Sequence, residues 1–310
     1  MAFFILKRLA AMLLTMLVVS VLIFLLLELS PESVATKVLG PYATEEQRRL
    51  WLEAHGYFSP LWHRYGVWLW HFLQGDFGQS LRFKVPVSQI LWPRLWNTAI
   101  LGFATFALLV PVSLVLGVLA GIKQGSPRDR VISVASVATT SVPEFASAVL
   151  VSALFVFWLD WLPGTSTMTE GFEIEQLVLP VLVLVLYDFG YVTRMTRASM
   201  ADVMGAPYIR TAELKGLPKR LVILRHALRN ALIAPFTVIM LQINWLLSGV
   251  IVVEVFFAYK GFGALLLEAS LNQDIHVIEA CAMVAVSVAV ATQTLADVAY
   301  AYLNPRIRFD

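Results

Sequence analysis

The sequence predicts an all-α membrane protein with six membrane-spanning helices. Of its 310 residues, 59% are hydrophobic and only 14% are charged, and the mean hydropathy is +0.75. This is more apolar surface than a soluble core of this size can bury. Six segments also reach the roughly 20 mainly apolar residues that a helix needs to cross a bilayer. The net charge of +2 is too small to indicate nucleic acid as a partner.

The six apolar segments set the expected spans. We place them near residues 9–29, 98–122, 131–158, 176–196, 232–257 and 281–303. The first begins like a signal peptide, but its apolar run is too long for a cleaved segment and no A-x-A site follows, so we expect a membrane anchor. Pro143 is expected to break the third span and Pro180 the fourth, because proline removes a backbone donor. These breaks have no symmetry-related partners, so we treat residues 1–310 as one membrane domain.

The basic residues predict the orientation of the chain. Lys and Arg accumulate in short loops on the cytoplasmic side of a membrane. Most of the 23 Lys and Arg residues fall at the two termini and in the loops at 123–130 and 194–229. We therefore expect a multi-pass protein of a bacterial cytoplasmic (inner) membrane with both termini in the cytoplasm and lipid as its surroundings.

A region outside the membrane, residues 30–97, carries its own helical signals. Thr44 and Gln47 have the spacing of a capping box, in which each side chain satisfies a free backbone N–H at a helix start. Apolar residues then recur with helical spacing over 61–72, with tryptophans between them, which is typical of an amphipathic helix at a membrane interface. This extracytoplasmic region either caps the outer ends of the spans or contacts the substrate directly.

A short polar segment, residues 208–216, is bracketed by Pro207 before it and by Gly216 at its end. Proline is favoured at the first position of a helix and glycine just past the last, so these residues predict an isolated helix of about two turns. Such a helix cannot span a bilayer. Held on the cytoplasmic face, it is suited to be gripped by a soluble partner that moves it.

Several motifs in one order resemble a known family. The segment Y-I-R-T-A-E-L-K-G at 208–216, followed by L-R-H-A-L-R-N-A at 224–231, resembles the cytoplasmic loop of permease subunits of ABC importers in the dipeptide, oligopeptide and nickel family. Three further matches are G-D-F-G-Q-S at 75–80, V-V-E-V-F-F-A-Y-K-G-F-G at 252–263 and N-P-R-I-R at 304–308. The resemblance covers nearly the whole chain.

This resemblance implies the type I ABC importer permease fold, with six transmembrane helices, a helical extracytoplasmic insertion at 30–97 and a cytoplasmic coupling loop at 198–231. It also implies partners, namely a second homologous permease subunit, two ATPase subunits and an extracytoplasmic substrate-binding protein. The chain has no G-x-x-x-x-G-K-[ST] loop, so we expect it not to be an enzyme. ATP and Mg are expected on the partner ATPase subunits, and no cofactor on this chain.

The coupling helix would transmit motion from the ATPases to the spans connected to it. Eight residues are expected to serve it, in four roles: apolar contact (Tyr208, Ile209), close approach (Thr211, Ala212), polar rim contacts (Arg210, Glu213, Lys215) and the turn (Gly216).

Acidic residues at membrane depth are costly and usually face a cavity or a partner group. Glu144 and Asp188 fall near the middle of their spans, where the family usually has small, aromatic or apolar residues, and Glu254 falls nearer the end of its span. We expect these three to line the translocation pathway, and Glu144 and Asp188 to favour a cationic cargo group such as a peptide amine. The alternative is that they bond to neighbouring helices, to Arg194 or to a tyrosine.

No catalytic or metal site is expected. The single cysteine, Cys281, excludes an internal disulfide and is expected to pack as a small apolar residue. His55, His63 and His71 are spaced by eight residues, which would place successive rings about 80° apart round a helix, a poor arrangement for one metal.

The sequence leaves the cargo open. Short peptides are the default, and nickel, opines or oligosaccharides are alternatives for the same machinery. A secondary transporter or an intramembrane hydrolase would be a different class, although the chain lacks an H-E-x-x-H motif.

Overall fold

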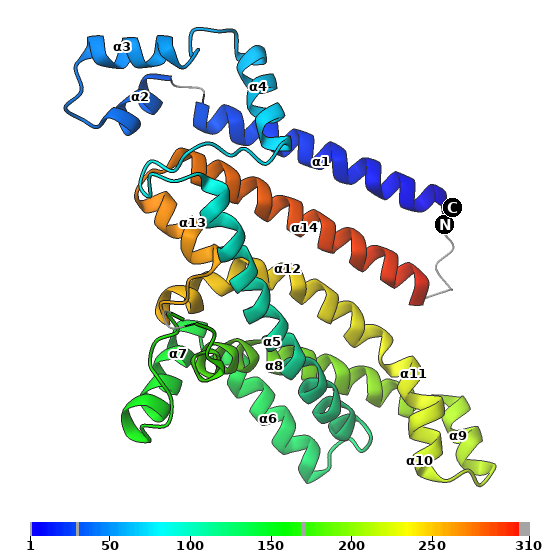
Figure 1. The fold of residues 1–310 in the computed structure, drawn as a ribbon. Coiled ribbons are helices and arrows are strands. Elements are labelled where there is room, and N and C mark those ends of the chain that lie inside the picture. Colours follow the sequence, from blue (N-terminus) through cyan, green and yellow to red (C-terminus); the bar gives the residue numbers. More distant parts are fainter. Residues whose placement is uncertain (1, 29–30, 169–170, 304–310) are drawn as a thin grey trace. The chain divides into compact units, whose positions relative to one another are not determined.

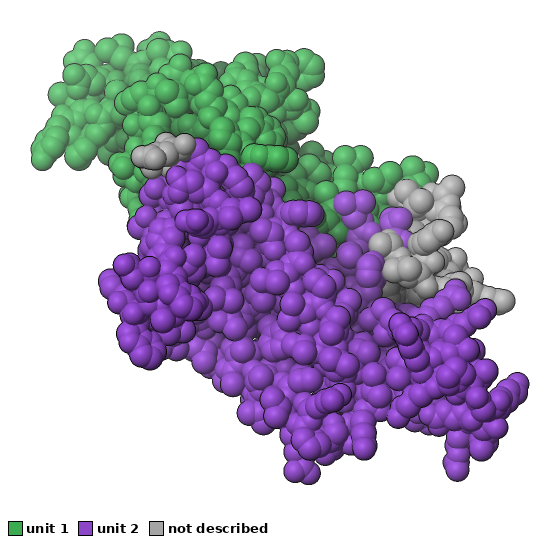
Figure 2. All heavy atoms as spheres, turned by 60° about the horizontal axis from the view of Figure 1, so that its bottom comes forward, with its two compact units in different colours: residues 1–98, 261–294 green, residues 99–260, 295–310 purple. Residues whose placement is uncertain are grey.

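The computed structural model describes residues 2–28, 31–168 and 171–303, and in this part of the chain the regular structure is helical (Figure 1). The end of the first predicted span at residue 29 and the N-P-R-I-R signature at 304–308 lie outside the described residues. The chain divides into two units (Figure 2), residues 1–98 with 261–294 and residues 99–260 with 295–310, here called unit 1 and unit 2.

Unit 1 holds the helices at the start of the chain and a helical hairpin near its end. Its elements are α1 (Ala2–Glu28), α2 (Pro31–Leu39), α3 (Glu45–Ala54), α4 (Leu61–Leu73), the first part of α5 (Val87–Gly121), α13 (Phe262–Leu271) and most of α14 (Ile275–Leu303). Val87 and Leu91 of α5 pack with Phe262, Leu265 and the neighbouring apolar residues of α13 and α14 into one buried cluster. This cluster joins segments that lie far apart in the sequence.

The predicted helical signals between residues 30 and 97 are confirmed. Thr44 caps α3 through its hydroxyl, which accepts from Gln47 N, while Gln47 Oε1 accepts from Thr44 N. The helix predicted over 61–72 is α4, and Tyr65 turns toward α1, where its hydroxyl lies 2.7 Å from Ser20 Oγ. Trp62 and Trp70 of α4 are exposed.

Unit 2 contains the longest helices of the second half of the chain. Its elements are the rest of α5, α6 (Pro127–Ser141), α7 (Glu144–Ser152), η1 (Ala153–Trp158), α8 (Ile174–Met204), α9 (Pro207–Leu214), α10 (Lys219–Leu221), η2 (Val222–Ala227), α11 (Leu228–Ala231), α12 (Ile233–Phe256) and the end of α14. The segments η1 and η2 are single turns of π-helix. α8 packs against α6, α7 and α12 and is the best buried of the long apolar helices.

The predicted number of spans agrees with the structure. Within the described residues, four helices (α1, α5, α8 and α14) are long and apolar enough to cross a membrane, and two bent helix pairs raise the number to six if each pair forms one span. α5 begins at Val87, well before the predicted start of the second span at residue 98. α5 is therefore longer at its start than the apolar segment that predicts it.

The third span is broken where the sequence predicts. α6 and α7 meet at an angle of 104° on either side of Val142 and Pro143. Val142 is extended, with φ −91° and ψ 125°, because the ring of the following proline disfavours helical backbone at the residue before it. The bend places Glu144 in the first turn of α7.

The prediction that Pro180 breaks the fourth span is wrong. α8 continues through Pro180 from Ile174 to Met204. Pro180 has no N–H to donate to the carbonyl oxygen of Gln176, four residues earlier. The hydroxyl of Ser166, in the segment before α8, donates to this oxygen instead. A side chain from outside the helix thus satisfies the acceptor that proline leaves open, and the helix is kept.

Glycines allow α8 to approach its neighbours closely. A Cβ built on Gly190 of α8 would lie 2.0 Å from the carbonyl oxygen of Ser136 in α6, and one on Gly117 of α5 would lie 2.5 Å from Cβ of Thr196. Real side chains do not tolerate such distances. Small residues at these positions allow the backbones to make the van der Waals contacts that hold helices together in a bilayer.

We expect Gly190→Ala to destabilise the protein, because its new methyl group would force α6 and α8 apart. Overpacking of this kind costs about 1–3 kcal/mol or more. The measurement is the thermal unfolding midpoint of the detergent-purified protein, followed by circular dichroism. Gly66→Ala is the control, because Gly66 lies in α4 with no atom within 4 Å of a built Cβ. Equal midpoints for the two variants would contradict the close α6–α8 contact.

Candidate coupling helix and buried polar group

The short helix predicted at 208–216 is α9, and both of its ends have the predicted chemistry. Pro207 is its first residue, and Gly216 lies just past its end with φ +74°. At this end Gly216 N donates to Glu213 O and Leu217 N donates to Ala212 O, the paired bonds of a Schellman motif. Glycine is favoured at the position with positive φ, so these local signals set the length of α9.

One face of α9 packs against its own chain. Ile209 is 1% exposed and Ala212 is 7% exposed, and both belong to a buried cluster with Met200 of α8 and with Val222, Ala227 and Ala231 of the following segments. The sequence analysis assigned Ile209 and Ala212 to contact with a partner. The structure instead places both against unit 2, because helical periodicity puts them on the face that covers the end of α8.

The opposite face of α9 is exposed. It carries Arg210, Thr211 and Leu214, with Tyr208, Glu213 and Lys215 at its sides. Leu214 is 82% exposed. At about 100° per residue it lies on the far side of the helix from Ile209 and Ala212, a relation that the spacing alone could have revealed. The prediction omitted Leu214, which is the most exposed apolar residue of this helix.

An ion pair fixes the start of α6 to α8 near the end that carries α9. Arg197 of α8 makes two hydrogen bonds to the buried carboxylate of Asp129, from Nε to Oδ1 and from Nη2 to Oδ2, the latter 2.8 Å long. Gly125 N and Ser133 Oγ donate to the same carboxylate. All of these donors converge on one charge, and such bidentate, fully hydrogen-bonded geometry gives a strong pair. No local sequence pattern reveals this pair, because Asp129 and Arg197 lie 68 positions apart.

The structure brings two of the predicted pathway residues together. Glu144 of α7 and Asp188 of α8 are 9% and 2% exposed, and the two helices that carry them pack against each other. Gln242 of α12 donates through Nε2 to Asp188 Oδ1 at 2.6 Å. Among the described residues, Glu144 Oε1 and Asp188 Oδ2 are buried side-chain oxygens without a hydrogen-bond partner. We call Glu144, Asp188 and Gln242 the buried polar group.

The alternative expectation, that the acidic residues bond to neighbouring helices, holds for Asp188. Asp188 bonds to a neighbouring helix, but through Gln242, which the sequence analysis missed. An amide at membrane depth in an apolar span was the available signal for it. The Nε of Arg194, the partner considered from the sequence, donates to the carbonyl oxygen of Gly190.

The third predicted pathway residue lies at another depth. Glu254 is fully buried near the end of α12, and its backbone carbonyl accepts from Tyr259 N at 2.7 Å. It follows Gln242 by twelve residues, about 18 Å along a helix axis. Glu254 therefore does not extend the buried polar group.

The three histidines considered as metal ligands, and the single cysteine, lie in unit 1. In the part of the chain that the structure describes, no group of three or more His, Cys, Asp and Glu side chains could hold a metal ion. His55 follows α3, whereas His63 and His71 lie in α4, so they do not share one helix. Cys281 is buried in the cluster of α5, α13 and α14.

The G-D-F-G-Q-S segment is pinned to the turn between α13 and α14. Ser80 Oγ and Arg82 N both donate to Asp274 Oδ2. The Arg82 side chain donates to Glu268 Oε1 and to Asn272 Oδ1, each at 3.0 Å. These bonds hold a loop without regular structure at a defined position in unit 1.

The helices and the buried acidic residues indicate the class of protein. Helices of membrane length packed around buried carboxylates, with a short helix that has one exposed face, indicate a multi-pass membrane protein. Residues 113–309 match the family described as binding-protein-dependent transport system inner membrane component. The chain belongs to this family, whose fold is that of the type I importer permease and whose members are transport components, not enzymes.

Relatives along the whole chain agree with this. The chain is 35% identical to a Brucella abortus protein named as a peptide transport system permease, with 99% of each chain covered. It is 32% identical to the oligopeptide transport system permease protein AppB of Bacillus subtilis, with 100% of each covered. It is 34% identical to the glutathione transport system permease protein GsiC of Salmonella choleraesuis, with 99% of each covered.

We expect Asp129→Asn to destabilise the protein by about 3 kcal/mol, because it leaves Arg197 without its counter-charge in a partly buried site. The measurement is a double-mutant cycle of unfolding with Asp129→Asn, Arg197→Gln and the double variant. Strong coupling means that the double variant loses clearly less than the sum of the single losses. Additive losses would contradict an energetic role for the pair.

Proposed function

We propose that this chain is the transmembrane subunit of an ATP-driven importer, which forms with a second, similar permease the pathway for short peptides delivered by an extracytoplasmic binding protein. The names of relatives that align along the whole chain support peptides as the cargo class. The observation that carries the mechanical part is α9, a capped two-turn helix with one face anchored in unit 2 and the other exposed.

In this proposal both termini and α9 are cytoplasmic, and α2, α3 and α4 are extracytoplasmic. The distribution of Lys and Arg supports this orientation. Arg210, Lys215, Lys219 and Arg220 lie in or just after α9, and basic residues are enriched on the cytoplasmic side of membrane proteins. The cytoplasmic loop then runs over 198–231 and the extracytoplasmic insertion over 30–97.

The motion would reach the membrane through packed elements. ATP and Mg bound by two partner ATPases close the pair, and each ATPase moves the coupling helix that it holds. In this chain Ile209 and Ala212 anchor α9 to Met200 of α8. Asp129 and Arg197 tie α8 to α6, which leads into the bend before Glu144. A displacement of α9 is thus passed to α6, α7 and α8 as a rigid-body change between two packed states.

The buried polar group would contact cargo in the open pathway. Two carboxylates at membrane depth favour a cationic group, and a free peptide carries an ammonium group at its N-terminus. Gln242 would hold Asp188 through one oxygen and leave the other available to cargo. Glu254 would then act at another level of the pathway.

We expect Leu214→Asp to abolish ATPase binding, because it places a charge where α9 offers its most exposed apolar side chain. Apolar anchors at the centre of an interface commonly cost about 2 kcal/mol or more when removed. The amount of ATPase subunit that co-purifies with the tagged permease measures binding and should fall at least tenfold. Leu271→Asp is the matched control, since Leu271 is 76% exposed in unit 1. If the Leu214→Asp variant co-purifies with a normal amount of ATPase subunit, the exposed face of α9 is not the ATPase docking surface.

We expect Asp188→Asn to impair uptake of a peptide with a free N-terminus more than uptake of its N-acetylated analogue. The substitution removes a negative charge and keeps an oxygen that can accept from Gln242. The measurement is ATP-driven uptake by the reconstituted importer, with Glu175→Gln at an exposed position in the first turn of the same helix as control. Equal losses for both peptides would show that Asp188 does not select charge.

A further inference from the structure

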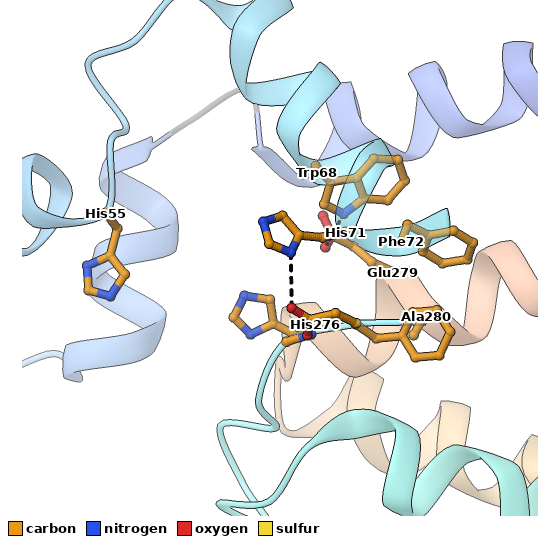
Figure 3. Close-up of a pocket in the computed structure, with 10 residues that line it drawn as sticks. His55, Trp68, His71, Phe72, His276, Glu279 and Ala280 are labelled. Carbon is orange, nitrogen blue, oxygen red and sulfur yellow. Dashed lines mark hydrogen bonds and ion pairs between the residues drawn. The ribbon is translucent and has the colours of Figure 1, made fainter. Parts of the chain in front are cut away.

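Unit 1 contains a pocket that the proposed transport mechanism does not use. It has a volume of about 400 Å³ and lies between α4, the loop at residues 76–78 and the first turns of α14. This size is in the range of pockets that hold small organic ligands, roughly 300–1,000 Å³. Figure 3 shows Trp68, His71 and Phe72 of α4 on one side, His276, Glu279 and Ala280 of α14 on the other, and His55 apart from both.

One wall of the pocket is aromatic. The rings of Trp68 and Phe72 have centroids 5.6 Å apart, and those of Phe72 and Phe77 are 4.9 Å apart. Aromatic faces attract cations through their quadrupole, most strongly where water is partly excluded. A continuous wall of three rings therefore suits an apolar body that carries a positive group.

Carboxylates lie at both ends of the pocket. Glu279 is 3% exposed and its Oε2 accepts from Trp68 Nε1 at 3.1 Å, so it belongs to the buried end. Asp76 lies at the mouth, with 61% of its side chain exposed. Among the described residues that line the pocket there is neither lysine nor arginine. Glu279 and Asp76 are thus the acidic side chains of the lining.

The histidine hydrogen bonds add further acceptors. His276 Nδ1 lies 2.9 Å from the carbonyl oxygen of Gln79, and His71 Nδ1 lies 3.1 Å from Asp76 Oδ2. Both partners can only accept, so in a neutral ring Nδ1 carries the hydrogen and Nε2 is an acceptor. His55 follows the same rule through the carbonyl oxygen of Trp51. The polar side chains of the pocket thus offer mainly acceptors, which match a ligand rich in N–H donors.

We propose that this pocket binds a small organic ligand through its ammonium group, with Glu279 and Asp76 as the charged acceptors and Trp68, Phe72 and Phe77 as the apolar wall. An ammonium group has three N–H donors and a positive charge, which the lining complements in both respects. A metal ion fits less well, because the described carboxylates and imidazoles form no group that could ligate one. The volume also exceeds what a single inserted side chain needs.

The identification of the ligand as cargo rests on the proposed function, which places this pocket on the extracytoplasmic side. A short peptide then meets an ammonium site on unit 1 in addition to Glu144 and Asp188 of unit 2. The site is preformed, because Gly78 N donates to Asp76 Oδ1 and His276 is held by Gln79.

The test is the binding of alanyl-alanine to the full-length chain in lipid nanodiscs, without ATPases or binding protein, followed by ligand-observed NMR titration. Glu279→Gln keeps the acceptor for Trp68 but removes the charge, and we expect at least fivefold weaker binding. Asp76→Asn, at the exposed mouth, should weaken binding about threefold if 0.6–0.7 kcal/mol is lost. Glu53→Gln, an exposed position of α3 outside the pocket, is the matched control.

Two outcomes would overturn the proposal: unchanged affinity in both pocket variants, or equally tight binding of N-acetyl-alanyl-alanine. Asp76→Asn remains informative if Glu279→Gln fails to fold. ATP-driven uptake by the wild-type importer is measured in parallel. If the wild-type importer takes up peptide but the pocket variants bind alanyl-alanine with unchanged affinity, the pocket proposal alone is refuted. If the wild-type importer takes up no peptide, the proposed function is refuted.

Discussion

The close approach of α8 to α5 and α6 is the constraint on which unit 2 depends. In a bilayer, apolar side chains gain little by leaving lipid for another helix, so helices associate through dense van der Waals contact. The absence of a side chain at Gly117 and Gly190 allows that contact, because any Cβ there would overlap a neighbouring helix. The helix that these contacts hold carries Asp188, Arg197 and, beyond its end, α9.

Polar groups within this apolar framework are satisfied by specific partners from other segments. Ser166 supplies the donor that Pro180 cannot, so a proline that would break an isolated helix leaves α8 continuous. Asp129 and Arg197 neutralise each other and gain further donors from Gly125 and Ser133. Such bonds are strong where water is scarce, and they give the packed helices a defined relation.

The buried polar group differs from these satisfied sites. Gln242 donates a hydrogen bond to one oxygen of Asp188. Among the described residues, Asp188 Oδ2 and Glu144 Oε1 have no hydrogen-bond partner. A buried polar atom without a partner is costly, and this cost is acceptable where a ligand or another state of the protein supplies the partner. The position of Glu144 directly after the α6–α7 bend links this group to a change in helix geometry.

The sequence by itself determined the features that depend on neighbours along the chain: the apolar spans, the capping box at Thr44, the break at Pro143 and both ends of α9. Tertiary structure decided which faces are covered, so that Ile209 is buried, Leu214 is exposed and Gln242 meets Asp188. It also decided that Pro180 would be tolerated. Hydrophobic length and caps act within one helix, whereas burial and long-range hydrogen bonds depend on which segments meet in space.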